Sequence, residues 1–98
     1  GKTMDILKKL VFNLEGLGFE KTKGKRQLYV KPLCEDEGFF VEYLPKYNSL
    51  VCGLKYLPLE DEMIEFYRID LRDLSQEKCY LLFSFIKDYV KLRTYGTN

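Results

Sequence analysis

The stretch that decides the fold is Ser75–Arg93, SQEKCYLLFSFIKDYVKLR, the longest apolar-periodic segment of the chain. Its apolar residues recur at the spacing of one helical face, which predicts a single long helix with Ser75 as its N-cap. The first apolar row consists of Cys79, Leu82, Phe83, Ile86 and Val90. A second row lies beside it and consists of Leu81, Phe85, Tyr89 and Leu92. Since a surface helix normally buries only one stripe, this helix needs cover on most of its circumference.

Length and composition predict one globular domain over residues 1–98. The chain has 98 residues, of which 46% are hydrophobic and 15% aromatic, enough to form one core. Met4 is a candidate for the natural first residue, which makes Gly1–Thr3 a candidate cloning remnant. No signal-peptide pattern and no apolar run of membrane-spanning length is present, so we expect no membrane partner.

Charge and cysteine content narrow the function classes. Sixteen basic and fifteen acidic residues give a net charge of +1, so no overall field attracts nucleic acid or anionic lipid. The three cysteines, Cys34, Cys52 and Cys79, form no CxxC pair, and their odd number does not suit a disulfide framework. We therefore expect a reducing compartment and a cytoplasmic location.

The N-terminal segment predicts a helix over Met4–Glu15 with its apolar stripe toward the core. The stripe consists of Ile6, Leu7, Leu10, Val11 and Leu14. Gly16 is expected to end the helix in the left-handed conformation, which would bring Leu17 against Phe12.

Between the helices, the pattern changes to short alternating segments. Strands are predicted over 19–22, 26–31, 39–44, 50–57 and 63–69, with turn residues between them. In the strand 50–57, alternation predicts that Leu50, Cys52, Leu54 and Tyr56 face inward and that Val51, Gly53 and Lys55 face outward. Gly53 also indicates a bulge or a close backbone approach. Residues 59–69 also fit helical spacing, so strand and helix both stay open there, with the strand preferred.

The predicted order is α-β-β-β-β-β-α. Short loops between consecutive strands favour an antiparallel sheet of four to five strands in one small α+β domain. The N-terminal helix and the long C-terminal helix are expected to flank this sheet.

A basic hairpin is the strongest local charge feature. Its candidate contacts to nucleic acid or another anion are Lys21, Lys23, Lys25, Arg26, Tyr29 and Lys31. The alternative is a solvated hairpin whose lysines protect an edge from pairing with other chains.

Residues 17–32, LGFEKTKGKRQLYVKP, resemble the opening of HicA-type toxins. The resemblance implies an α-β-β-β-α domain similar to double-stranded-RNA-binding folds. The ribonuclease activity of that family depends on a histidine just after the hairpin glycine, where this chain has Lys25 and Arg26. The chain contains no histidine, so the resemblance does not carry this activity over.

The sequence offers little for catalysis or for metal binding. Without histidine no Ser-His or Cys-His arrangement can form, and no glycine-rich phosphate loop is present. The acidic runs Glu35–Glu37 and Glu60–Glu62 lack the alternating spacing of a calcium loop, so we interpret them as solvated loops. We expect no cofactor, no metal site and no catalytic residue, and the chain is predicted to lack enzyme activity.

The surplus of apolar and aromatic residues, on a helix that is apolar on two sides, favours a protein–protein interface. The predicted function is therefore a small non-catalytic binding or regulatory protein that contacts a protein partner or a second copy of itself. The candidate interface residues are Leu81, Phe85, Tyr89, Leu92 and Phe40. A nucleic-acid-binding domain that uses the basic hairpin is the alternative.

Overall fold

The computed structural model of the protein describes residues 1–95 and has the predicted order of a helix, five strands and a long helix. The elements are α1 (Lys2–Gly16), β1 (Glu20–Lys21), β2 (Gln27–Pro32), β3 (Glu37–Leu44), β4 (Ser49–Tyr56), β5 (Met63–Asp70) and α2 (Gln76–Tyr95). Two short 3-10 helices, Pro45–Tyr47 and Leu71–Asp73, follow β3 and β5. The protein is thus an α+β domain, as predicted, with most element bounds within two residues of the prediction.

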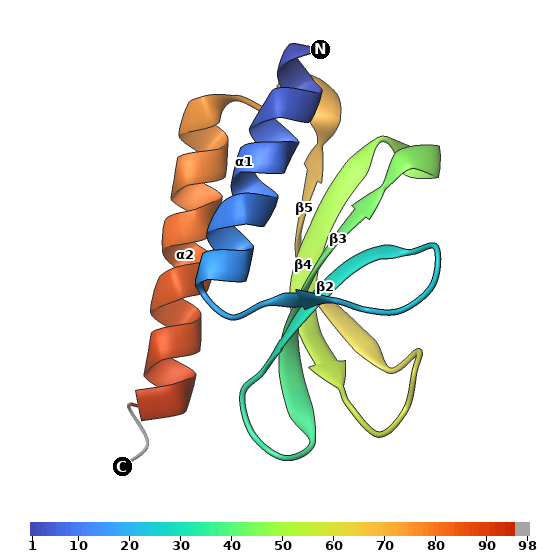
Figure 1. The fold of residues 1–98 in the computed structure, drawn as a ribbon, viewed down its shortest axis with the longest axis vertical. Helices are drawn as coiled ribbons and strands as arrows, with labels where there is room; N and C mark the ends of the chain where they lie inside the picture. Colours follow the sequence, from blue (N-terminus) through green and yellow to red (C-terminus); the bar gives the residue numbers. More distant parts are fainter. Residues whose placement is uncertain (96–98) are drawn as a thin grey trace.

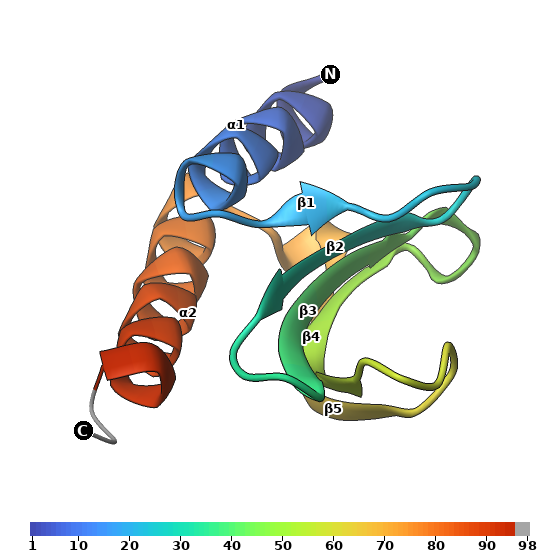
Figure 2. The ribbon, with the colours of Figure 1, turned by 60° about the horizontal axis from the view of Figure 1, so that its bottom comes forward.

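The five strands form one antiparallel sheet in the order β1-β2-β3-β4-β5, so every strand pairs with its neighbour in the chain (Figures 1 and 2). The stretch that the sequence left open, 59–69, is a turn followed by the strand β5. Within residues 1–95, β5 pairs with β4 alone and β1 with β2 alone, so these two strands are the edges of the sheet. β1 has only two residues, whereas β5 has eight.

Both helices lie on one face of the sheet, and the main core fills the space between them (Figures 1 and 2). The predicted stripe of α1 is buried there, except that Val11 is only partly covered. The first apolar row of α2 is buried as well, with Phe83 partly covered. Phe39, Val41, Leu50 and Cys52 supply the sheet side of this core.

The end of α1 differs from the prediction. Gly16 stays within the helix, and the left-handed residue is Gly18, with φ of 101°. The N–H of Gly18 donates to the carbonyl of Glu15, and the N–H of Phe19 donates to that of Leu14, both at 3.0 Å. This is a Schellman ending shifted by two residues from the predicted one.

The shift has a packing cause. In the observed ending, Phe19 and Leu14 form the apolar contact, and each is at most 2% exposed. The expected contact between Leu17 and Phe12 was wrong, since Phe12 is 74% exposed. Ending the helix at Gly18 buries a phenylalanine in the core, where Phe19 meets Phe39 edge to face with ring centroids 6.2 Å apart.

The start of α2 follows the prediction. The Oγ of Ser75 accepts a hydrogen bond from the N–H of Lys78 at 3.1 Å, as an N-cap side chain does. Leu74 and Cys79, on either side of this cap, are both buried. The helix therefore enters the core at a defined angle.

The sheet is strongly curved, and its concave face points away from the helices (Figure 2). This face holds a second, smaller core of Leu28, Phe40 and Val51, each at most 4% exposed. Val51 and Lys55, predicted to face outward, are therefore buried rather than solvated. The ammonium of Lys55 donates to the carbonyl of Leu59 at 2.9 Å, which satisfies this buried charge by hydrogen bonding.

The bulge that Gly53 predicts is present. The pairing of β4 with β5 slips between Cys52 and Gly53, because Cys52 faces Tyr67 and Gly53 faces Glu65. Phe66 is the additional residue, and the slip places Glu65 and Arg68 on the same face of β5.

Candidate functional site

A shallow apolar groove runs between α2 and the edge strand β5. Its volume is about 390 Å³, and its lining residues are Phe66, Tyr67, Ile69, Lys78, Leu81, Leu82 and Phe85. We call this feature the α2–β5 groove. Four of the lining side chains are both apolar or aromatic and exposed, namely Leu81 at 59%, Tyr67 at 53%, Phe85 at 46% and Phe66 at 41%.

An aromatic cluster holds one end of the groove in place. The ring of Tyr89 lies 5.7 Å from that of Phe66 and 6.1 Å from that of Phe85, measured between centroids. Phe39, which is fully buried, contacts all three rings from beneath. Because the exposed rings rest on a buried one, the groove surface is largely preformed.

A hydrogen bond and an ion pair fix Tyr89 further. Arg93 donates to the Tyr89 hydroxyl at 3.0 Å and lies 5.8 Å from the ring centroid. The same guanidinium forms an ion pair with Glu37 at the start of β3, so it ties the last turn of α2 to the sheet. The hydrogen bond to Glu37 and, to a lesser extent, the one to the Tyr89 hydroxyl raise the pKa of Arg93.

The structure brings together four of the five predicted interface residues. Leu81, Phe85, Tyr89 and Leu92 follow one side of α2, and Leu92, at 66% exposed, extends the row beyond the groove. Phe40 lies apart from them, 2% exposed in the concave core. We therefore leave Phe40 outside the candidate surface.

Sequence reasoning missed the β5 side of the groove, which consists of Phe66 and Tyr67 with Ile64 further along the strand. The available signal was the run Met63–Ile69, whose aromatic and branched residues alternate poorly. A strand that is last in a meander is also an edge strand, and its side chains have a neighbouring strand on one side only. Ile64 is 65% exposed as a result.

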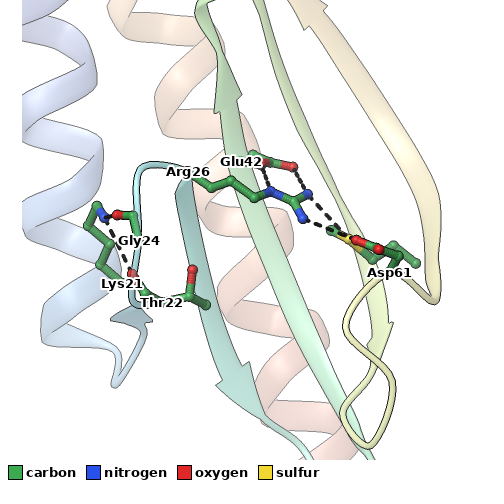
Figure 3. A network of polar contacts seen from close by, with 7 residues as sticks. Lys21, Thr22, Gly24, Arg26, Glu42 and Asp61 are labelled. Atoms are coloured by element: carbon green, nitrogen blue, oxygen red, sulfur yellow. Dashed lines mark hydrogen bonds and ion pairs between the residues drawn. The ribbon is translucent and has the colours of Figure 1, made fainter.

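The residues of the predicted basic site are distributed over different surfaces. Lys23 and Lys25 are exposed at the tip of the β1–β2 hairpin, whereas Lys21 donates at 3.0 Å to the carbonyl of Gly24 (Figure 3). Tyr29 is half-buried against the main core, and its pKa is raised by burial and by the charge of Glu15. Lys31 lies over Gly18, next to the end of α1.

Arg26 is held in an ion-pair network that closes the concave face. Its Nε donates to Glu42 Oε2 at 2.8 Å and its Nη2 to Glu42 Oε1 at 2.9 Å (Figure 3). Its Nη1 lies 3.5 Å from Asp61 Oδ1, in the loop between β4 and β5. Arg26 and Asp61 lie at diagonally opposite corners of the sheet, which its curvature brings together. The hydrogen bonds to Glu42 raise the pKa of Arg26, and its positive charge is neutralised by a carboxylate of the same chain.

Among residues 1–95, no cysteine and no carboxylate side chain lines the α2–β5 groove. Cys52 and Cys79 are buried, and burial raises the pKa of both thiols, that of Cys52 to about 12. Cys34 is exposed in the loop before β3, where Asp36 lies 3.5 Å from its sulfur. Within residues 1–95 no group of three or more cysteine or carboxylate side chains is placed to hold a metal ion.

A second opening lies on the other side of the helical layer, between α1 and the strands β2 to β4. It has a volume of about 420 Å³, and its lining includes Met4, Phe12, Tyr29 and Tyr43. Lys8, Glu15 and Gln27 also line it, so its wall is more polar than that of the α2–β5 groove.

Comparison with known proteins assigns the chain to no family. No protein-family model matches the chain, and no curated protein or solved structure is significantly similar to it. Neither of the described helices is both long enough and apolar enough to cross a membrane.

Proposed function

We propose that the protein is a small non-catalytic binding protein whose protein–protein interface is the α2–β5 groove. The observation that carries this proposal is the continuity of exposed apolar side chains across two elements. Leu81 and Phe85 from α2 face Phe66 and Tyr67 from β5 across one groove. Single exposed apolar residues are common on protein surfaces, but a contiguous patch on two elements is typical of an interaction site.

The composition of the groove supports the same proposal. Its exposed residues are mainly aromatic, and Lys78 is the charged residue among those that line it. Cores of protein interfaces are likewise enriched in aromatic residues and depleted of charge. Fully burying one such side chain contributes about 1.5–3 kcal/mol, and a few such anchors carry most of the binding energy in typical interfaces.

The preformed cluster of aromatic rings also supports the proposed interface, because it lowers the cost of ordering side chains on binding. Ordering a flexible side chain on binding costs about 0.5–1.5 kcal/mol. Tyr89 and Phe85 already rest on Phe39, so a partner avoids part of this cost.

The test is a pair of substitutions on neighbouring positions of α2. Leu81→Lys places a charge in the groove, whereas Tyr80→Lys changes the adjacent residue, which is 70% exposed and faces the gap between α1 and α2. Association is measured by native mass spectrometry and by quantitative pulldown with wild-type and variant baits at equal concentration.

We expect Leu81→Lys to reduce the recovered complex at least tenfold and Tyr80→Lys to leave it unchanged. Equal recovery with both variants would place the interface elsewhere. A wild-type chain that forms no complex and binds no apolar dye would remove the basis of the proposal.

The alternative, nucleic-acid binding, rests on the hairpin tip. Lys23 and Lys25 are exposed and form no ion pair within residues 1–95, so their charges are available to phosphates. Arg26 and Tyr29 are engaged elsewhere, Lys21 bonds to the backbone of the hairpin itself, and Lys31 lies over Gly18. Two of the six predicted contacts, Lys23 and Lys25, are therefore left at the tip. This alternative predicts a salt-dependent affinity for RNA or DNA that Lys23→Ala combined with Lys25→Ala abolishes.

A further inference from the structure

We infer that the partner at the α2–β5 groove is a second copy of this chain, joined through antiparallel pairing of the two β5 strands. This inference rests on the proposed function and specifies its partner. The two-fold axis passes between Phe66 and Tyr67, and the two sheets become one continuous sheet across it.

The free edge of β5 supplies the backbone for this pairing. β5 spans eight residues, about 26 Å at the usual rise per residue, and in the described part of the chain only one of its sides is paired. The opposite edge of the sheet is the two-residue strand β1, which offers much less backbone. An exposed edge of this length is a template for another strand.

The charges on β5 match those of a second copy in one antiparallel register. Glu65 and Arg68 lie on the same face of the strand, where Arg68 Nη2 is 2.7 Å from Glu65 Oε1. Residues three apart normally point to opposite faces of a strand, and the bulge at Phe66 is what aligns these two. Each side chain is 45% exposed, so both can reach across the edge.

Placing the axis between Phe66 and Tyr67 sets Glu65 of each copy opposite Arg68 of the other. Opposite charges then alternate around the axis, and each carboxylate gains a second guanidinium. A register centred on Glu65 or on Arg68 would instead set like charges against each other, which is unfavourable. Of these three registers, the one centred between Phe66 and Tyr67 is therefore the one that sets opposite charges against each other.

The apolar side chains fit the same register. Phe66 of one copy faces Tyr67 of the other, and Ile64 faces Ile69, all on the helix side of the sheet. The α2–β5 grooves of the two copies then adjoin across the axis, so Leu81 and Phe85 gain cover from the partner. Because the same patch is used on both copies, the assembly closes as a dimer.

A charged, bulged edge is also a known protection against unwanted pairing, and charge reversal separates the two roles. Glu65→Arg and Arg68→Glu each place four like charges at the axis of a homodimer. We expect each variant to dimerise at least about 100-fold more weakly than the wild type. The double variant E65R/R68E restores the alternation and the dimer.

Mixing the two single variants gives the decisive result. One chain then carries two arginines at its edge and the other two glutamates, so the pairing predicts a 1:1 heterodimer and little of either homodimer. Native mass spectrometry distinguishes the three species, because the two variants differ in mass, and sedimentation velocity gives the dissociation constants. Circular dichroism and thermal melting of each variant establish that it is folded.

Two outcomes overturn this inference and leave the proposed function standing. In one, the dimer is unaffected by both charge reversals but is lost with Leu81→Lys, which places the contact on α2 alone. In the other, the wild type is a monomer at every concentration, while a different protein binds it in a manner that depends on Leu81. Failure of the mixed variants to form a heterodimer also overturns the inference, because loss of both homodimers alone could reflect local damage to the edge strand.

Discussion

A Cβ atom added to Gly53 would lie 1.9 Å from the backbone carbonyl oxygen of Ile64 on the neighbouring strand. Real Cβ atoms do not approach an oxygen this closely, so β4 and β5 would have to separate. We expect Gly53→Ala to lower the free energy of unfolding by more than about 2 kcal/mol, measured by urea denaturation. A smaller change would mean that the bulge can move without loss of pairing.

The two glycines at the end of α1 are expected to respond in opposite directions. Gly16 lies in the helix, with open space around its Cβ position, so Gly16→Ala should raise the free energy of unfolding by about 0.5 kcal/mol. Gly18 has φ of 101°, so Gly18→Ala should lower it by about 1 kcal/mol. Urea unfolding of both variants measures the contrast. A stabilising Gly18→Ala would contradict the assigned helix ending.

The pair Arg26–Glu42 should behave as a coupled unit. The Glu42 side chain is 5% exposed, so Arg26→Ala leaves a buried carboxylate without its partner and should cost about 2 kcal/mol of stability. Arg26→Met combined with Glu42→Leu removes both charges and should cost less than Arg26→Ala alone. Unfolding free energies of the single and double variants give the coupling. Additive costs would show that the two residues act independently.

The lowered pKa of Asp70 should make the free energy of unfolding depend on pH in the acid range. Its carboxylate accepts hydrogen bonds from the side chain of Arg72 and from the Arg72 N–H, which lower its pKa from 3.8 to about 2. Since the folded state favours the ionised form, this contribution is complete above pH 3.8 and is lost as the pH falls through 2. The stability difference between wild type and Asp70→Asn should therefore shrink over this interval. Urea titrations at several pH values measure it, and a constant difference would contradict the assignment.

Thiol labelling tests the burial of the cysteines. Cys34 is exposed, whereas Cys52 is 1% and Cys79 8% exposed, and the pKa of the Cys52 thiol is raised to about 12. Because the thiolate is the reactive form, we expect one thiol per native chain to react rapidly and all three to react in denaturant. Rapid labelling of two or three thiols in the native state would show that the main core opens readily. Cys34→Ser is the control, and it should abolish the fast phase.

Local patterns in the sequence predicted most of the fold. The row from Cys79 to Val90 and the cap at Ser75 gave α2, because helical periodicity and capping depend on neighbouring residues. Gly53 indicated a bulge or a close backbone approach, and the structure has both at this position. The end of α1 was predicted at Gly16 rather than Gly18, because the choice depends on whether Phe19 reaches the core.

Curvature of the sheet was not predictable from these patterns. Alternation assigned Val51 and Lys55 to the outward face, but in the curled sheet both are buried, Val51 in the second core and Lys55 with its ammonium bonded to the carbonyl of Leu59. The same curvature takes Arg26 out of the predicted basic site and places it next to Asp61. One side of the candidate groove, Leu81 and Phe85, was predicted from helical spacing. The other side, Phe66 and Tyr67, depends on which strand lies at the edge, and only the assembled sheet decides that.

Because α2 is the last element of the described chain to be made, its contribution to the main core affects folding during synthesis. The strands pair only with neighbours in the sequence, so the hairpins can form as they leave the ribosome. The helix face of the sheet stays half covered until α2 has been made, because α2 contributes Leu82, Ile86 and Val90 to the main core. A nascent chain halted before Ser75 would expose Phe39 and Cys52, and we expect it to be a substrate for chaperones.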